Sequence, residues 1–220
     1  MAGFSIRRYR SADHAAVRLL FAEGMLGYVP STCFYLLRLP RVHVFLALSF
    51  ILLFAISKSC PLSLVGVMVE LAAGWCLMKA EFQAYVKRCH GADLQDIEKS
   101  YLLKRKCCFW VAEAEGKVIG IVGVQPAPGA EDTLVLRRLS VAKRSRGQGV
   151  AKALCKMVID FGHQHECKQV TLDTSIIQRA AHGLYESLGF EKTEVRYVRT
   201  LYGRFADFSV HYYTYTLKQL

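Results

Sequence analysis

Residues 139–154 read LSVAKRSRGQGVAKAL, and this stretch decides the fold. The pattern predicts a strand, a basic turn and then a helix with apolar residues three and four positions apart. Gly147 and Gly149 have no Cβ and let the backbone approach a ligand, while the helix N-terminus offers free N–H groups. Seven basic residues and no acidic residue lie between Arg137 and Lys156. The stretch predicts a site for a di- or polyphosphate; the alternative is an ordinary connection with solvated charges.

The overall composition is slightly more apolar than that of a soluble domain. The hydrophobic fraction of the 220 residues is 53%, against about 45–50% in typical soluble domains. The charged fraction of 21% excludes a disordered polyelectrolyte. The net charge of +11 implies an anionic partner, which is a phosphorylated ligand, a membrane surface or nucleic acid. The basic residues gather at the turn that contains Gly147 and Gly149, which is called the phosphate-binding turn below. We therefore expect no nucleic-acid partner.

The eight cysteines show no metal-binding or disulfide pattern. No pair has the C-x-x-C spacing, and no Cys/His group has the spacing of metal ligands. We therefore expect reduced thiols and no bound metal. The chain contains no Asn, so it has no N-glycosylation acceptor. Both observations favour a domain that faces the cytosol.

The excess of apolar residues is confined to residues 42–78, which carry two charges, Lys58 and Glu70. Two apolar arms, 42–56 and 62–78, flank a polar segment with Pro61. One helix through both arms would be about 55 Å long, too long for a hydrocarbon core of about 30 Å. The pattern therefore predicts a membrane-embedded helical hairpin, with Glu70 facing the other arm or lying near an interface because a carboxylate is costly in lipid. The alternative is a pair of buried helices in a soluble protein.

The sequence outside the hairpin predicts a mixed α/β fold. This fold forms one discontinuous domain, residues 1–41 and 79–220, and the hairpin at 42–78 is an insert in it. The periodicity and the turn residues set the expected elements. Ser11 is the expected cap of the first helix, and Gly189 the left-handed residue that ends the last. We expect strands at 4–9, 108–114, 117–124, 133–141, 169–173, 192–201 and 206–217, helices at 13–25, 94–103, 149–161 and 177–188, and a loop at 126–132.

Two motifs resemble a known family. Residues 146–151, RGQGVA, are similar to [Arg/Gln]-x-x-Gly-x-[Gly/Ala], the acetyl-CoA pyrophosphate signature of the GCN5-related N-acetyltransferases (GNAT). Residues 178–190 resemble a second block of that family, Asn-x-x-Ala-x-x-Leu-Tyr-x-x-x-Gly-Phe, with Gln178 in place of the commoner Asn. The order of the two blocks identifies the chain as a member. The resemblance implies the GNAT fold, a mixed central sheet flanked by helices, and acetyl-CoA held by Leu139, Val141, Arg146, Gly147, Gln148, Gly149, Val150 and Ala151.

Several local runs narrow the resemblance to the camello-like group, vertebrate N-acetyltransferase family 8. These runs are 39–41, 99–102, 109–113 and 147–154, together with the hydrophobic insert. The resemblance implies a protein bound to the membrane of the endoplasmic reticulum or Golgi that acetylates the α-amino group of cysteine S-conjugates. A protein lysine N6-acetyltransferase of the secretory pathway is the alternative. The second alternative is a membrane-tethered, non-catalytic interaction protein. The intact motif residues argue against this alternative.

The resemblance also implies how the chemistry proceeds. The acceptor amine attacks the thioester directly, the amide near Leu139 polarises the carbonyl, and Tyr185 protonates the leaving thiolate. Tyr185 alternatively only packs and hydrogen-bonds the sulfur. Many members carry a Glu on the strand that is 133–141 here, and this chain has none. Asp173 is the nearest carboxylate by sequence logic and is the candidate base; the alternatives are a water relay and an Asp173 that only caps the turn with Thr174.

Arg137 and Arg138 are the candidate residues for the acceptor. Strict alternation along a strand would place them on opposite faces, so that one enters the cleft. An arginine there suits an acceptor with a carboxylate, and the alternative is a solvated or phosphate-facing side chain.

Charge predicts the orientation of the hairpin. Both ends of the insert belong to one domain, so it crosses an even number of times or re-enters. Lys58 is the only basic residue at the tip, whereas Arg38, Arg41, Lys79, Lys87 and Arg88 flank the two ends. By the positive-inside rule the catalytic domain faces the cytosol.

Overall fold

The expected fold class is confirmed by the computed structural model, which describes residues 3–198, 203 and 206–217. Seven strands form one sheet in the order β1-β2-β3-β4-β5-β7-β6, where β4 and β5 are parallel and the other neighbours are antiparallel. The strands are β1 Ser5–Arg8, β2 Cys108–Ala114, β3 Lys117–Ala127, β4 Ala130–Val141, β5 Gln169–Ser175, β6 Glu191–Tyr197 and β7 Ser209–Thr216. The helices are α1 His14–Leu26, α2 Val29–Leu37, α3 Pro40–Ser57, α4 Cys60–His90, α5 Val150–Gln164 and α6 Arg179–Ser187.

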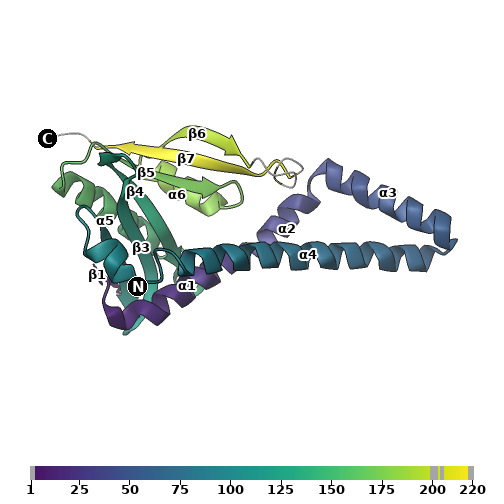
Figure 1. Ribbon diagram of the computed structural model, residues 1–220, viewed down its shortest axis with the longest axis horizontal. Coiled ribbons are helices and arrows are strands. Elements are labelled where there is room, and N and C mark those ends of the chain that lie inside the picture. The colour runs from purple at the N-terminus through teal and green to yellow at the C-terminus, as the bar shows by residue number, and fades with distance from the viewer. Residues whose placement is uncertain (1–2, 199–202, 204–205, 218–220) are drawn as a thin grey trace.

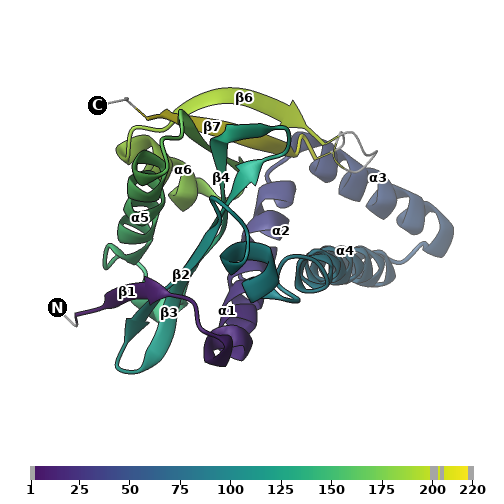
Figure 2. The same ribbon diagram turned by 60° about the vertical axis from the view of Figure 1, so that its left-hand side comes forward.

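Helices cover both faces of the sheet (Figure 2). Helices α5 and α6 pack on one face, over a core that includes Trp110, Leu134 and Leu154. Helix α1 and the end of α4 pack on the other face, over a second core that includes Phe21, Tyr101 and Phe109. Strand β1 pairs with β2, so the chain before the insert and the chain after it share one sheet.

Helix α5 forms where the sequence predicts it because its apolar residues recur on one side. Val150, Leu154 and Val158 lie at intervals of four and are buried against the sheet. Gly120 on β3 makes room for this contact, since a Cβ there would lie 2.8 Å from Val150 and 3.0 Å from Leu154. The phosphate-binding turn is thereby fixed to the centre of the sheet.

The expected cap of the first helix is wrong. Ser11 begins a short 3₁₀ turn, Ser11–Asp13, and its hydroxyl donates to Glu98 instead. Asp13 occupies the N-cap position of α1, but its side chain makes no capping bond to that helix; it accepts the backbone N–H of Arg10 at 2.8 Å and the guanidinium of Arg7 at 2.7 Å. The first helix therefore begins without the side-chain cap that the sequence predicts.

Two other expected elements differ from the structure. The loop expected at 126–132 is absent, because β3 continues to Ala127 and β4 begins at Ala130. A tight turn at Pro128 and Gly129 joins them, and Gly129 adopts the left-handed φ of +78° that such turns require. The helix expected at 94–103 is only a π-helical turn, Glu98–Leu102. The described part of the last two strands is shorter than expected, and residues 199–201 lie outside the described residues.

Helices α3 and α4 form a hairpin that projects from the domain (Figure 1). Lys58 turns the chain with a left-handed φ of 51°, and Pro61 lies in the first turn of α4. Within the apolar stretches of α3 and α4, 0% and 6% of the residues are buried. Two buried helices of a soluble core would not expose their apolar side chains in this way, so the alternative of a soluble helix pair is not favoured. Helix α4 also continues past Met78 to His90 and reaches the sheet.

The two helices of the hairpin contact each other through small and polar residues. Ser49 Oγ on α3 donates to Glu70 Oε1 on α4 at 2.7 Å, which confirms that Glu70 faces the other arm. Gly66 lies so close to α3 that a Cβ there would stand 2.5 Å from Leu53 Cδ1. Small residues at such contacts let helices approach closely where lipid offers no hydrophobic driving force.

The substitution Gly66→Val should separate the two helices of the hairpin. The added side chain would overlap Leu53, and overpacking of this kind costs about 1–3 kcal/mol. We expect a lower midpoint of thermal unfolding, followed by circular dichroism of the protein in detergent micelles. Gly74→Val on the same helix is the control, because no atom lies within 4 Å of a Cβ at Gly74. Equal midpoints for the two variants would contradict the close contact.

Candidate active site

The sheet opens between β4 and β5. Thr133–Val135 of β4 pair in parallel with Gln169–Thr171 of β5, and the two strands pair nowhere else along their described length. On its other side, β5 pairs with β7. Beyond Val135, the edge of β4 that faces this opening has no strand partner among the described residues. A strand edge of this kind presents backbone N–H and C=O groups to a bound molecule. Leu139 and Val141, the predicted contacts of the pantetheine arm, both lie on this edge.

The phosphate-binding turn closes one end of the opening. Gly147 and Gly149 have left-handed φ values of +77° and +81°, and no atom lies within 4 Å of a Cβ at either position. Gly149 is the N-cap of α5, so the N–H groups of the first turn point into open space. Val150 has a fully buried side chain, so only its backbone is available to a phosphate. The geometry suits an anion held by backbone N–H groups and the helix dipole.

Side chains of the turn hold its shape. Arg146 Nε donates to the carbonyl of Val141 at 3.3 Å, and Gln148 Nε2 donates to the carbonyl of Arg144 at 3.2 Å. Arg146 and Gln148 remain exposed, and Arg146 keeps further donors for a phosphate. All the residues predicted to bind acetyl-CoA are therefore brought together on β4, the turn and the first residues of α5.

Tyr185 lies on α6, and its side chain is buried with an exposed fraction of 5%. Its ring contacts Phe190 and Tyr213 at centroid distances of 5.8 and 6.0 Å. Burial, with smaller contributions from Cys155, Tyr28 and Asp173, raises the pKa of Tyr185 well above its ordinary value. The phenol stays protonated at neutral pH, as a general acid requires.

The ends of α6 are fixed by the residues of the second motif. Gln178 Oε1 accepts from Thr174 Oγ1 at 2.9 Å and from the backbone N–H of Ser175 at 3.1 Å, which joins β5 to the start of α6. Gly189 has a φ of +90°, which confirms the expected left-handed cap. The N–H of Phe190 donates to the carbonyl of Tyr185 at 3.0 Å and closes the helix end.

Asp173 lies near the mouth of the opening, opposite Tyr212 in the β5–β7 ladder, and its side chain is exposed. Its charge contributes to the raised pKa values of both Tyr185 on α6 and Tyr85 on α4.

Arg137 and Arg138 do not point to opposite faces, so this expectation is wrong. Residues 138 and 139 together oppose the single residue Val122, which makes a β-bulge with Arg138 at a φ of +60°. Arg137 pairs with Gly123, where a Cβ would meet Tyr101, and the Arg138 side chain binds Asp93. Both arginines therefore face α1 and α4. Arg138 is held in an ion pair, whereas Arg137 Nε is buried with no hydrogen-bond partner in the described part of the chain.

One polar network was not predicted. His182 on α6 lies 2.8 Å from the hydroxyl of Tyr213 on β7, and this hydroxyl donates to Glu186 at 2.9 Å. Burial and Glu186 raise the pKa of Tyr213 to about 12. His182 Nε2 lies 3.0 Å from the carbonyl of Ser175 and so ties α6 to β5. No spacing rule links residues 31 positions apart in the sequence, so only the fold reveals this network.

The thiol of Cys155 is buried and inert. Cys155 lies inside the core, and burial raises the pKa of its thiol to about 12, so it does not supply a thiolate nucleophile at neutral pH. All eight cysteines are free. Among the residues that the structure describes, no three His, Cys, Asp or Glu side chains are grouped to hold a metal ion.

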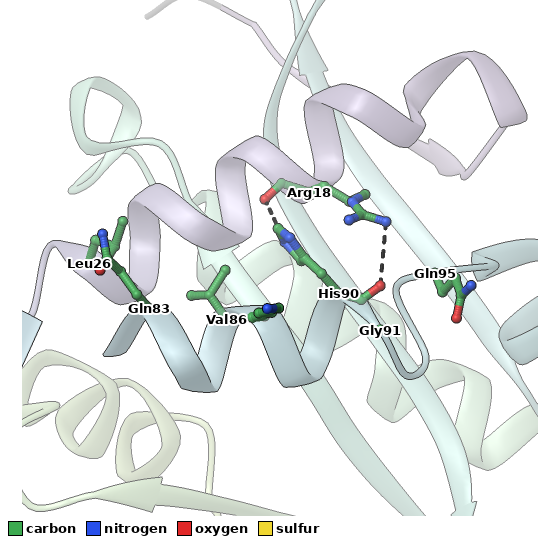
Figure 3. Close-up of a pocket in the computed structure, with 8 residues that line it drawn as sticks. Arg18, Leu26, Gln83, Val86, His90, Gly91 and Gln95 are labelled. Atoms are coloured by element: carbon green, nitrogen blue, oxygen red, sulfur yellow. Dashed lines mark hydrogen bonds between the residues drawn. The ribbon is translucent and has the colours of Figure 1, made fainter. Parts of the chain in front are cut away.

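A separate cavity lies away from this opening. It has a volume of about 470 Å³ between α1 and α4 (Figure 3), and its lining includes Arg18, Gln83 and His90. Arg18 Nη1 donates to the carbonyl of His90 at 3.4 Å, while His90 Nε2 lies 3.1 Å from the carbonyl of Arg18. These contacts join two helices, and none of the predicted site residues lines the cavity.

Comparisons with known proteins agree with this geometry. Residues 75–190 match the family model described as Acetyltransferase (GNAT) family. The chain is 42% identical to Probable N-acetyltransferase camello of Xenopus tropicalis, over 99% of this chain and 100% of that protein. It is 40% identical to N-acetyltransferase 8B of Homo sapiens, over 99% of this chain and 96% of that protein. A solved GNAT-family acetyltransferase from Staphylococcus aureus Mu50 has the same fold, with a TM-score of 0.60, 14% identity and coverage of 98% and 100%.

Members of this family use acetyl-CoA as co-substrate, and the opening between β4 and β5 with its basic turn suits that molecule. The chain belongs to the GNAT family of acetyl-CoA-dependent N-acetyltransferases and resembles its camello and N-acetyltransferase 8 members over nearly its full length.

Proposed function

We propose that this enzyme transfers acetyl to the α-amino group of a small amine that carries a carboxylate, such as a cysteine S-conjugate. The observation that carries the proposal is Arg137, whose buried Nε has no hydrogen-bond partner among the described residues. A buried guanidinium nitrogen in that state suits a carboxylate partner, because an unsatisfied buried donor is costly. The surplus of basic residues around the turn also favours an anionic acceptor over a lysine side chain.

The residues of the opening have separate roles in the proposed transfer. The turn from Arg146 to Ala151 holds the pyrophosphate of acetyl-CoA, and the free edge of β4 at Leu139 and Val141 binds the pantetheine arm. The N–H near Leu139 stabilises the charge that develops on the thioester oxygen, an effect worth about 3 kcal/mol. Tyr185 gives its proton to the departing thiolate. Asp173, or a water that it orients, accepts the proton of the attacking amine.

The acceptor class can be tested with matched amines. We expect the purified enzyme to release CoA from acetyl-CoA faster with S-benzylcysteine than with its methyl ester or with a lysine peptide. Arg137→Gln should raise KM for S-benzylcysteine by about 10- to 100-fold, as expected for a lost charge-assisted hydrogen bond. The methyl ester is the control, and its KM should not change. A faster rate with the lysine peptide would favour a protein lysine N6-acetyltransferase, and CoA binding without turnover would favour a non-catalytic protein.

We further propose that residues 42–78 are embedded in the membrane of the endoplasmic reticulum, with the acetyltransferase domain formed by 1–41 and 79–220. The length and exposure of α3 and α4 support the membrane contact. The base of the hairpin is held to the domain, since Arg41 Nη2 lies 2.5 Å from Asp207 Oδ2. Basic residues at the base, against Lys58 at the tip, support a domain on the cytosolic side.

Protease protection tests this orientation. In sealed vesicles of endoplasmic reticulum, tags on both termini should be digested from outside without detergent. Because β1 and β2 pair, both chain segments lie on one side of the membrane, and the positive-inside rule makes that side the cytosol. Protection of both tags would place the active site in the lumen, and protection of one tag alone would exclude the hairpin.

A further inference from the structure

The β-bulge at Arg138 places a non-glycine residue in a backbone conformation that it rarely adopts. Arg138 has a φ of +60°, and the register of β3 and β4 shifts between Ile121 and Gly123. Left-handed backbone is unfavourable for a residue with a Cβ and persists only where surrounding contacts enforce it. Something outside the strand must therefore hold Arg138 in this conformation.

The Arg138 side chain is bound by residues at the end of α4 and just after it. Its Nη2 and Nε donate to the two carboxylate oxygens of Asp93 at 2.6 and 2.9 Å. Its Nη1 lies 2.8 Å from Cys89 Sγ, and its guanidinium stands 5.2 Å from the centre of the Phe21 ring. The two side chains of the ion pair keep exposed fractions of only 12% and 14%.

Asp93 is itself fixed in place. The Tyr101 hydroxyl donates to the same carboxylate. Burial opposes ionisation, but the hydrogen bonds from Arg138 and Tyr101 hold the pKa of Asp93 below its ordinary value. Asp93 therefore stays ionised and bound to Arg138 at neutral pH.

The bulge determines where the next residues of β4 point. Leu136 and Leu139 both pack toward the core under α5, whereas strict alternation would send Leu139 to the other face. The backbone of Leu139 follows Arg138 directly, at the edge of the opening. The conformation of Arg138 thus sets the position of the backbone group that the proposed mechanism assigns to the thioester oxygen.

We propose that Asp93 is a positioning residue for acetyl transfer: its ion pair with Arg138 holds the left-handed backbone of the bulge and so aligns the Leu139 backbone with the thioester. The inference rests on the proposed role of Leu139. Asp93 touches no reacting atom and acts through Arg138.

Glycine and alanine at position 138 separate this role from simple stabilisation. Glycine adopts a φ of +60° without strain, and alanine does not. The variants to compare are Asp93→Asn, the double variant D93N/R138A and the double variant D93N/R138G. The two double variants leave no buried charge and differ by one methyl group, so they remain informative if Asp93→Asn alone folds poorly.

A second ion pair supplies the matched control. Arg7 binds Asp13 with exposed side-chain fractions of 24% and 9%, but it lies on the regular strand β1, where no bulge occurs. Asp13→Asn should lower the thermal midpoint without changing kcat, because Asp13 lies outside the opening.

We expect Asp93→Asn to lower kcat about 10- to 100-fold, the scale of a small misplacement of reacting groups, with little change in acetyl-CoA affinity measured by calorimetry. D93N/R138A should remain slow, and D93N/R138G should recover kcat by about tenfold. Equal kcat values for the glycine and alanine double variants would overturn the proposal, as would an Asp93→Asn variant that only melts earlier, like Asp13→Asn.

The acceptor proposal can fail separately. If wild-type enzyme does not acetylate S-benzylcysteine, the acceptor class is wrong, and the same four variants are compared with the amine that wild type does acetylate. The ratio of kcat between the glycine and alanine double variants then decides the role of Asp93.

Discussion

Gly149→Glu should abolish acetyl-CoA binding, with an affinity at least about 100-fold weaker than that of wild type. The carboxylate would lie at the N-terminus of α5, where the pyrophosphate is expected, and would fill open space at the Cβ position. Coulomb repulsion and the loss of the left-handed backbone at a φ of +81° act in the same direction. Isothermal titration calorimetry with acetyl-CoA measures the effect.

Gly129→Glu is the matched control for this variant. Gly129 has a φ of +78°, and no atom lies within 4 Å of a Cβ there, but it lies in the turn between β3 and β4. The two substitutions impose the same strain and the same charge. If both variants bind acetyl-CoA as wild type does, the phosphate-binding turn is wrongly assigned.

Tyr185→Phe should lower kcat about 10²- to 10⁴-fold with little change in acetyl-CoA affinity. The substitution removes the proton that the thiolate would receive, while the ring keeps its contacts with Phe190 and Tyr213. Because burial raises the pKa of Tyr185, the wild-type rate should not fall through loss of this proton below about pH 10. Steady-state kinetics across the pH range measures both effects.

A control on a distant tyrosine completes the test. Tyr197 on β6 is 63% exposed, and Tyr197→Phe should leave kcat unchanged. An unchanged kcat for Tyr185→Phe as well would reduce Tyr185 to a packing residue, the alternative that the sequence left open.

Local signals in the sequence sufficed for the phosphate-binding turn and for α5. Glycines, basic residues and apolar spacing lie within one short stretch, and the turn uses the same residues for its conformation and its proposed ligand. The motif from Gln178 to Phe190 is equally local, because each end of α6 is fixed by residues within it. Patterns that close within about a dozen residues are the ones that sequence reasoning recovers.

Features that depend on distant contacts could not be predicted. Side chains of β4 do not alternate between the two faces at Arg138, because a β-bulge shifts the strand by one residue. Asp93, 45 positions away, binds Arg138 and stabilises this bulge. Ser11 does not cap the first helix, because its hydroxyl donates to Glu98, 87 positions away. The end of α4 was placed at Met78 from hydropathy, but Val86 and Cys89 pack under the sheet and extend the helix to His90.

Hydrogen exchange with and without acetyl-CoA tests the central claim most directly, that the opening between β4 and β5 and its basic turn bind the co-substrate. Acetyl-CoA should slow exchange of backbone amides in peptides that cover residues 136–151, because those N–H groups become hydrogen-bonded or shielded. Peptides from β1 and from the cavity between α1 and α4 should not change. Protection at that cavity, with unchanged exchange at 136–151, would contradict the account.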